Sequence, residues 1–151
     1  MSHARSEHQD FKAAVPDVYE AVRALSDVAG KAGFDKQLLE LIKVRASQIN
    51  GCAFCLQYHI LQGERLGVSV DKLNLVAVWR EAPQFSQRER AALAWTEALT
   101  LLPSGVSDEV YEQARAAFSE TELFYLTSAV ASINAWNRFG AAYRWTPPAR
   151  G

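Results

Sequence analysis

The chain has 151 residues, of which 49% are hydrophobic and 22% are charged, and its formal net charge at pH 7 is -1. This length favours one domain with its own hydrophobic core. The balanced charge gives no electrostatic reason to expect nucleic acid or an anionic membrane as a partner. No apolar stretch approaches the roughly 20 residues of a membrane span, and the polar start lacks the apolar core of a secretory signal. We therefore expect a cytoplasmic protein.

Apolar residues recur at helical spacing along most of the chain, and Gly and Pro lie between the repeats. This pattern predicts an all-α bundle of about six to seven helices that forms a single domain over residues 1–151. The polar residues 1–10 and the proline-containing tail 146–151 are expected to be loose. The first predicted helix spans 16–29, and the second begins at the cap Asp35 and ends near Ile49.

The remaining helices follow in chain order. The third is predicted from about residue 52 to 67, and the fourth from Ser69 to about residue 79. Ser86 with Glu89 forms a capping box before the fifth helix, which ends near residue 101. The sixth is predicted over 107–118 and the seventh, with a second capping box, over 119–143.

Both cysteines of the chain, Cys52 and Cys55, lie near the start of the third predicted helix, and His59 follows four residues later. At about 100° per residue, all three side chains share one narrow stripe of that helix. In a reducing compartment, a close pair of cysteines is more typical of catalysis, redox sensing or metal binding than of a structural disulfide. Thiol redox chemistry is therefore the leading hypothesis.

The Asn50-Gly51 pair predicts a left-handed helix stop, so the second and third helices should form an antiparallel hairpin. At about 1.5 Å per residue, Glu40 then lies about 15 Å from the turn and His59 about 10 to 11 Å from it. The Glu40 carboxylate should lie nearer the imidazole than either thiol. We expect a bridging water between Glu40 and His59.

The positions of the two thiols suggest different ways to activate them. Cys52, in the first turn, should gain from unpaired backbone N–H groups and the helix dipole, which lower a thiol pKa. Cys55 lies four residues before His59, where an imidazole can take its proton. These arguments leave open which thiol attacks first.

Other interpretations of the same residues remain. Cys52, Cys55, His59 and Glu40 could together ligate zinc, although one helical stripe is a poor tetrahedron. Arg45 and Ser47 are interpreted as structural. The last predicted helix is interrupted by polar and aromatic residues that should serve hydrogen bonding or subunit contact, and further aromatic residues should form core and interface. The first set consists of Asn134, Trp136, Asn137 and Arg138. The second set consists of Trp79, Trp95, Phe124, Tyr125, Phe139, Tyr143 and Trp145.

The run from Glu40 to His59 resembles the core motif of alkyl hydroperoxidase D (AhpD)-type proteins in the carboxymuconolactone decarboxylase superfamily. That motif has a Glu twelve residues before a CxxC pair and a His four residues after it, which matches Glu40, Cys52, Cys55 and His59. The resemblance is sharp over about 38–67, with a weaker echo near 134–139. One branch has a second His between the cysteines, where this chain has Phe54.

The resemblance implies an all-helical homotrimer or homohexamer that reduces hydroperoxides without metal or cofactor. Cys55 would be the attacking thiol and Cys52 the resolving one, while Glu40 and His59 would move the proton. An external dithiol or disulfide reductase would regenerate the pair. Two other activities remain as alternatives: a non-redox enzyme acting on a lactone or keto acid, and a zinc-bound or metal-free helical interaction protein.

Overall fold

The computed structural model describes residues 2–151, and helices account for all of their regular secondary structure, which confirms the all-α prediction. None of the helices in this part of the chain has the length and apolar character needed to span a membrane. The α-helices are α1 (His8–Ala14), α2 (Pro16–Lys31), α3 (Lys36–Asn50), α4 (Ala53–Arg65), α5 (Val70–Leu75), α6 (Gln87–Thr100), α7 (Asp108–Ala117) and α8 (Glu120–Tyr143), and the 3-10 helices are η1 (Val76–Glu81) and η2 (Leu102–Ser104).

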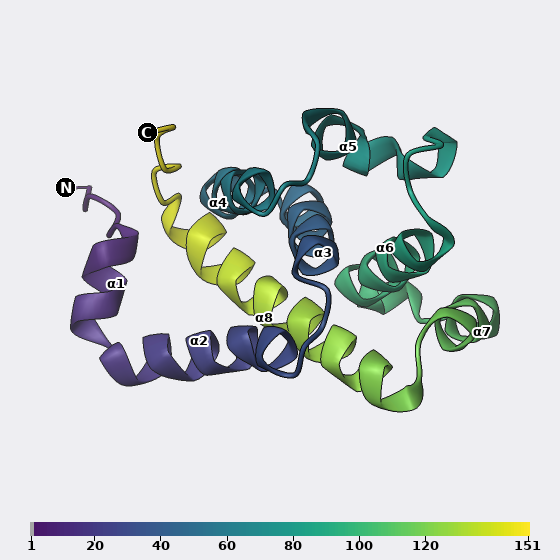
Figure 1. Ribbon diagram of the computed structural model, residues 1–151. Coiled ribbons are helices and arrows are strands. Elements are labelled where there is room, and N and C mark those ends of the chain that lie inside the picture. Colours follow the sequence, from purple (N-terminus) through teal and green to yellow (C-terminus); the bar gives the residue numbers. More distant parts are fainter. Residues whose placement is uncertain (1) are drawn as a thin grey trace.

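The long helix α8 crosses the whole molecule, as Figure 1 shows, and packs against α2, α3, α4, α6 and α7. Helix α3 is enclosed between α4, α6 and α8. Leu39 and Ile42 of α3 belong to one buried cluster with Val130 of α8, and Leu41 belongs to a second with Trp79. Because α3 is buried on several sides, the side chains it carries have well-defined positions.

The predicted caps form as the sequence indicates. Asp35 accepts hydrogen bonds from the backbone N–H groups of Gln37 at 2.9 Å and Leu38 at 3.4 Å. Ser86 and Ser119 each form the expected capping box at the start of α6 and α8. These side chains satisfy backbone donors that the first turn of a helix leaves unpaired, which is why the helices start there.

The two ends of the chain, expected to be loose, lie outside regular secondary structure over residues 2–7 and 145–151 but make specific contacts. Helix α1 begins at His8, after a capping box between Glu7 and Asp10. The Glu7 carboxylate also accepts hydrogen bonds from Thr146, at 2.9 Å from its backbone nitrogen and 2.8 Å from its hydroxyl oxygen. Trp145 is only 2% exposed. The two ends of the chain are therefore held together, because aromatic side chains near each end are buried against α8.

Candidate active site

The hairpin between α3 and α4 sets the geometry of the site. Gly51 adopts the left-handed conformation, with a φ of 67°, and ends α3 as the sequence predicts. The backbone N–H of Cys52 then donates to the carbonyl oxygen of Ser47 at 3.1 Å. A glycine accommodates this turn without the steric penalty of a side chain. The turn brings α4 back along α3, so that residues of the two helices face each other.

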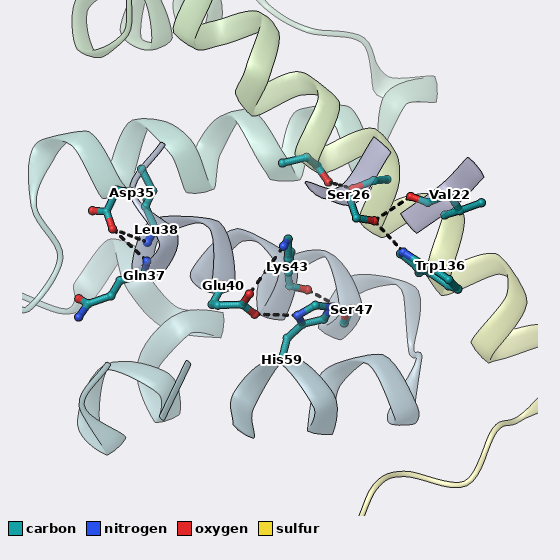
Figure 2. A network of polar contacts seen from close by, with 12 residues as sticks. Val22, Ser26, Asp35, Gln37, Leu38, Glu40, Lys43, Ser47, His59 and Trp136 are labelled. Atoms are coloured by element: carbon teal, nitrogen blue, oxygen red, sulfur yellow. Dashed lines mark hydrogen bonds and ion pairs between the residues drawn. The ribbon is translucent and has the colours of Figure 1, made fainter. Parts of the chain in front are cut away.

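Glu40 and His59 are in direct contact across this hairpin. The Nδ1 atom of His59 lies 2.7 Å from Oε2 of Glu40, and Nζ of Lys43 lies 3.6 Å from the other carboxylate oxygen. Figure 2 shows the three side chains meeting between the two helices. The predicted proximity is confirmed, whereas the expected bridging water is wrong. The Glu40 side chain is long enough to close the difference in height, so no third group is needed.

The protonation states of this pair follow from its burial and contacts. Burial raises the pKa of Glu40, but the hydrogen bond and charge of His59, together with Lys43, outweigh it and hold that pKa below its ordinary value. Burial lowers the pKa of His59 by more than Glu40 raises it. At neutral pH, Glu40 is therefore ionised and His59 is neutral. The Nδ1–H group of His59 donates to Glu40, which leaves Nε2 free to accept a proton.

Cys52 and Cys55 form a disulfide, and their Cα atoms are 5.3 Å apart. Cys52 is the N-cap residue of α4, and its Sγ accepts a hydrogen bond from the backbone N–H of Cys55 at 3.2 Å. Cys52 is 1% exposed and Cys55 is 3% exposed. The helix start thus supplies a backbone donor to Cys52, which favours its thiolate when the pair is reduced.

A pocket of about 370 Å³ opens beside the disulfide, and Cys55, His59 and Glu40 all line it, whereas Cys52 does not. The structure thus brings three of the four predicted site residues to one cavity, and the fourth, Cys52, is bonded to Cys55 outside the lining. Aromatic side chains make much of the wall. The pocket is lined by His8, Tyr19, Arg23, Ser26, Asp27, Glu40, Lys43, Phe54, Cys55, Tyr58, His59, Gln62, Ser132, Ile133, Trp136 and Trp145.

The sequence did not reveal the aromatic wall of the pocket. Trp145 was expected to belong to the core or an interface, and His8 was expected to be loose. In the structure, the His8 ring stacks on Phe54 with centroids 5.1 Å apart and lies edge-on to Trp145 at 5.0 Å. The only local signal was the presence of aromatic residues at both ends of the chain, which does not indicate where they dock.

Helix α8 approaches the disulfide closely at Gly140. A Cβ atom added at this position would overlap Sγ of Cys52 and would lie 3.0 Å from Sγ of Cys55. The same Cβ would lie 3.6 Å from the Trp145 ring. Gly140 is therefore the residue that lets α8 cover the back of the cysteine pair.

A polar network joins α3 to α8 behind the site. The Asn137 side chain is 1% exposed and donates to the Ser47 hydroxyl at 3.1 Å. Asn50 donates to both Asn137, at 2.9 Å, and Asn134, at 3.0 Å. Trp136 donates through Nε1 to Ser26 at 2.8 Å (Figure 2). Asn134, Trp136 and Asn137 thus take part in structural hydrogen bonds, of which the Asn137–Ser47 bond is buried.

Metal binding finds no support in the arrangement of side chains. Within residues 2–151, no group of three or more His, Cys, Asp or Glu side chains is placed to hold a metal ion. The two candidate sulfur ligands are joined to each other, and the Nδ1 atom of His59 is occupied by Glu40.

The fold and the site define a helical protein with a disulfide at the start of a helix and a His–Glu pair that shares a pocket with Cys55. The model of the carboxymuconolactone decarboxylase family matches residues 16–98, more than half of the chain. The uncharacterized protein YdfG of Bacillus subtilis is 30% identical over 138 residues, which cover 91% of this chain and 94% of that protein. This chain belongs to the carboxymuconolactone decarboxylase family and is AhpD-like.

Solved structures support the same assignment. An Agrobacterium tumefaciens protein of unknown function, proposed to be the antioxidant defence protein AhpD, is 37% identical with a TM-score of 0.90, and the match covers 98% of this chain and 100% of that one. The debrominase Bmp8 shares the fold at 22% identity and a TM-score of 0.80, covering 89% of this chain and 73% of that one. A Bmp8 variant has also been solved with a tribromopyrrole.

Proposed function

We propose that this protein reduces organic hydroperoxides with the Cys52–Cys55 dithiol. The observation that carries the proposal is that one pocket contains a sulfur of the cysteine pair and the imidazole that Glu40 orients. The Agrobacterium relative, proposed to serve antioxidant defence, supports the same class of chemistry. The mixed polar and aromatic lining suits a hydroperoxide with an apolar organic part.

Cys55 is the attacking residue in this proposal, because it lines the pocket and Cys52 does not. His59 accepts the Cys55 proton at Nε2, and Glu40 stabilises the resulting imidazolium. The thiolate attacks the terminal oxygen of the hydroperoxide, the O–O bond breaks, and the leaving alkoxide takes the proton to become an alcohol. Cys55 is now a sulfenic acid.

The second half of the cycle needs Cys52. Its thiolate attacks the Cys55 sulfur, hydroxide leaves and becomes water with the Cys52 proton, and the disulfide forms. One hydroperoxide and two thiols thus give one alcohol, one water and one disulfide. An external dithiol then reduces the disulfide by thiol–disulfide exchange, and Cys55 is the sulfur it would reach through the pocket.

The proposal includes a homo-oligomer, either a trimer or a hexamer. Large apolar side chains are exposed on the single chain, notably Phe124 at 67%, Leu102 at 55% and Leu101 at 51%. Such side chains are more often covered in an assembly than left in water. Light scattering at micromolar concentration should give a mass well above 16.8 kDa, and a monomer would contradict the expectation.

A pulse experiment tests the proposed activity. Fully reduced protein is mixed with one equivalent of cumene hydroperoxide, and free thiols are counted along with the alcohol formed. The thiol count should fall from two to zero with one alcohol per chain. Cys55→Ser should not react, whereas Cys52→Ser should accumulate a sulfenic acid that dimedone traps. Unchanged thiols in the wild-type protein would refute the proposal.

A brominated aromatic is the second candidate substrate, favoured by the aromatic side chains of Phe54, Tyr58 and Trp136 beside Cys55 and by the shared fold of Bmp8. Here the Cys55 thiolate would attack bromine, the C–Br electron pair would stay on carbon, and carbon would take a proton. Cys52 would then displace bromide to form the disulfide. Bromide release from a tribromopyrrole, without thiol loss to hydroperoxide, would favour this activity over the first.

A further inference from the structure

His8 places a second imidazole in the pocket of Cys55. It is the first residue of α1, and its half-buried ring lines the same cavity as Cys55 and His59. Phe54, the neighbour of Cys55, stacks against one face of the ring, with an interplanar angle of 22°. Tyr19 and Trp145 contact it edge-on at centroid distances of 5.7 and 5.0 Å. The ring is thus held among aromatic side chains that line the pocket.

The position of His8 depends on contacts that fix α1. Phe11, one turn further along α1, stacks on Phe139 of α8 with centroids 4.5 Å apart. Glu7, just before α1, is bonded to Thr146 in the C-terminal segment. Both ends of the first turn are therefore anchored, and His8 is presented from a fixed element rather than from a frayed terminus.

The nitrogen atoms of His8 have no assigned structural task. Within residues 2–151 the ring is held by aromatic contacts, and no hydrogen bond to either ring nitrogen is formed. Burial and the nearby charge of Lys12 lower the pKa of His8. At neutral pH the ring is therefore predominantly neutral and offers one N–H donor to whatever occupies the pocket.

Several other donors around the pocket are already engaged or exposed, whereas the buried Nε1–H group of Trp145, which also lines the pocket, has no hydrogen-bond partner among residues 2–151. Nδ1 of His59 is bonded to Glu40, and Lys43 pairs with the same carboxylate. Arg23 has a side chain that is 56% exposed and lies 3.9 Å from Asp27. The oxygen that leaves as an alkoxide develops negative charge as the O–O bond breaks, and a donor fixed in advance near it lowers the barrier. The Trp145 nitrogen is fully buried, whereas the half-buried His8 ring keeps an unengaged N–H group at the pocket.

We propose that His8 is a catalytic residue that donates a hydrogen bond to the leaving oxygen of the hydroperoxide while Cys55 attacks the terminal oxygen. The inference rests on the proposed hydroperoxide reduction. The proton that completes the alcohol is the one His59 removed from Cys55, so His8 stabilises charge and is not consumed. The role predicts a dependence on the leaving group, because a peracid releases a carboxylate that needs little stabilisation, whereas an alkyl hydroperoxide releases a strongly basic alkoxide.

Single-turnover oxidation of the reduced protein tests this role with two oxidants, cumene hydroperoxide and peracetic acid. His8→Phe keeps an aromatic ring between Phe54 and Trp145 but removes the N–H donor. We expect it to slow oxidation by cumene hydroperoxide about 100-fold and to change oxidation by peracetic acid by less than about twofold. His8→Gln, which restores an N–H donor, should recover part of the cumene hydroperoxide rate. His3→Phe is the matched control, because His3 is exposed and lies outside the pocket.

The outcomes separate the two proposals. If the wild-type protein reacts with cumene hydroperoxide and His8→Phe reacts equally fast, the role of His8 is overturned and the proposed function stands. Equal slowing with both oxidants also overturns it, because that result indicates disturbed packing or an altered Cys55. A wild-type protein that is inert toward cumene hydroperoxide overturns both proposals. A selective loss with the alkyl hydroperoxide and partial recovery in His8→Gln establish the hydrogen bond.

Discussion

Glu40 and His59, 19 residues apart in the chain, are joined by a 2.7 Å contact that connects α3 to α4. Their side chains are 11% and 12% exposed, so solvent only weakly screens the attraction between the Glu40 carboxylate and His59 when His59 is protonated. The contact with the carboxylate places the proton of the neutral imidazole on Nδ1 and leaves Nε2 without a proton. In the proposed reaction, this contact orients His59 to act as the proton acceptor for Cys55.

Removing the Glu40 charge should weaken the base. In Glu40→Gln the imidazolium that forms when His59 takes the Cys55 proton loses its anionic partner, so proton removal becomes harder. We expect single-turnover oxidation by cumene hydroperoxide to slow about 10- to 100-fold. Stopped-flow measurement of disulfide formation checks this. Glu64→Gln is the matched control, since Glu64 is a glutamate of the neighbouring helix α4 that pairs with Arg150 and does not line the pocket. A wild-type rate in Glu40→Gln would contradict the role of Glu40.

The stability of the protein should fall on mild acidification. Burial lowers the pKa of His59 below its ordinary value of 6.5, so the unfolded chain takes up a proton at a higher pH than the folded chain. The contribution of His59 to the free energy of unfolding is fully present above the pKa that His59 has in the unfolded chain. It is lost as the pH falls toward the pKa that His59 has in the folded protein. His8, whose pKa is also lowered by burial, contributes with the same sign. Glu40 follows at lower pH, because its folded pKa is likewise depressed.

Thermal unfolding measured from about pH 7.5 to about pH 5 tests this sign. The midpoint of the wild-type protein should decrease as the pH falls, and His59→Gln should show a shallower decrease. His3→Gln provides the control, because His3 is exposed. A midpoint that rises on acidification, or an identical slope in His59→Gln, would show that the buried imidazole does not couple folding to protonation.

The elements that could be predicted from the sequence are those with local signals. Asp35, Ser86 and Ser119 mark helix starts by their own hydrogen bonds, and Gly51 marks the turn by its backbone freedom. Given the turn, helix geometry alone brought Glu40 near His59. The direct contact also depends on how far each side chain extends, and the heights of the backbone positions along the helices do not include that distance.

The N-terminal part of the site could not be predicted in the same way. Helix α1 has only seven residues, too few for apolar periodicity to be informative. His8 enters the pocket through contacts with Phe54 and Trp145, which are distant in the chain. No local pattern specifies that docking, so the pocket wall became visible only with the tertiary structure.

The buried amide of Asn137 should be costly to remove. It accepts from Asn50 at 2.9 Å and donates to Ser47 at 3.1 Å, and it is 1% exposed. In Asn137→Leu the buried Ser47 and the half-buried Asn50 each lose a hydrogen bond. We expect the free energy of unfolding to fall by about 2 to 3 kcal/mol. Chemical denaturation measures the change. Asn134→Ala should cost less, because Asn134 is half-buried and Asn50 keeps its bond to Asn137. Equal losses in the two variants would contradict this account of the network.

The close approach of α8 to the cysteine pair makes Gly140 sensitive to a single methyl group. A Cβ there would overlap Sγ of Cys52 and crowd Sγ of Cys55, and neither sulfur can move away while the disulfide holds them together. We expect Gly140→Ala to lower the free energy of unfolding of the oxidised protein by about 1 to 3 kcal/mol.

Gly30→Ala is the matched control for that substitution, because Gly30 is also helical and a Cβ there would meet no atom within 4 Å. It should leave stability unchanged or raise it by up to about 1 kcal/mol, since alanine favours the helix over glycine. Denaturant unfolding of both variants, oxidised and reduced, makes the comparison. The loss in Gly140→Ala should be smaller after reduction, when the sulfurs are free to separate. If Gly140→Ala were as stable as Gly30→Ala in the oxidised state, α8 would not be packed against the disulfide in the way the structure shows.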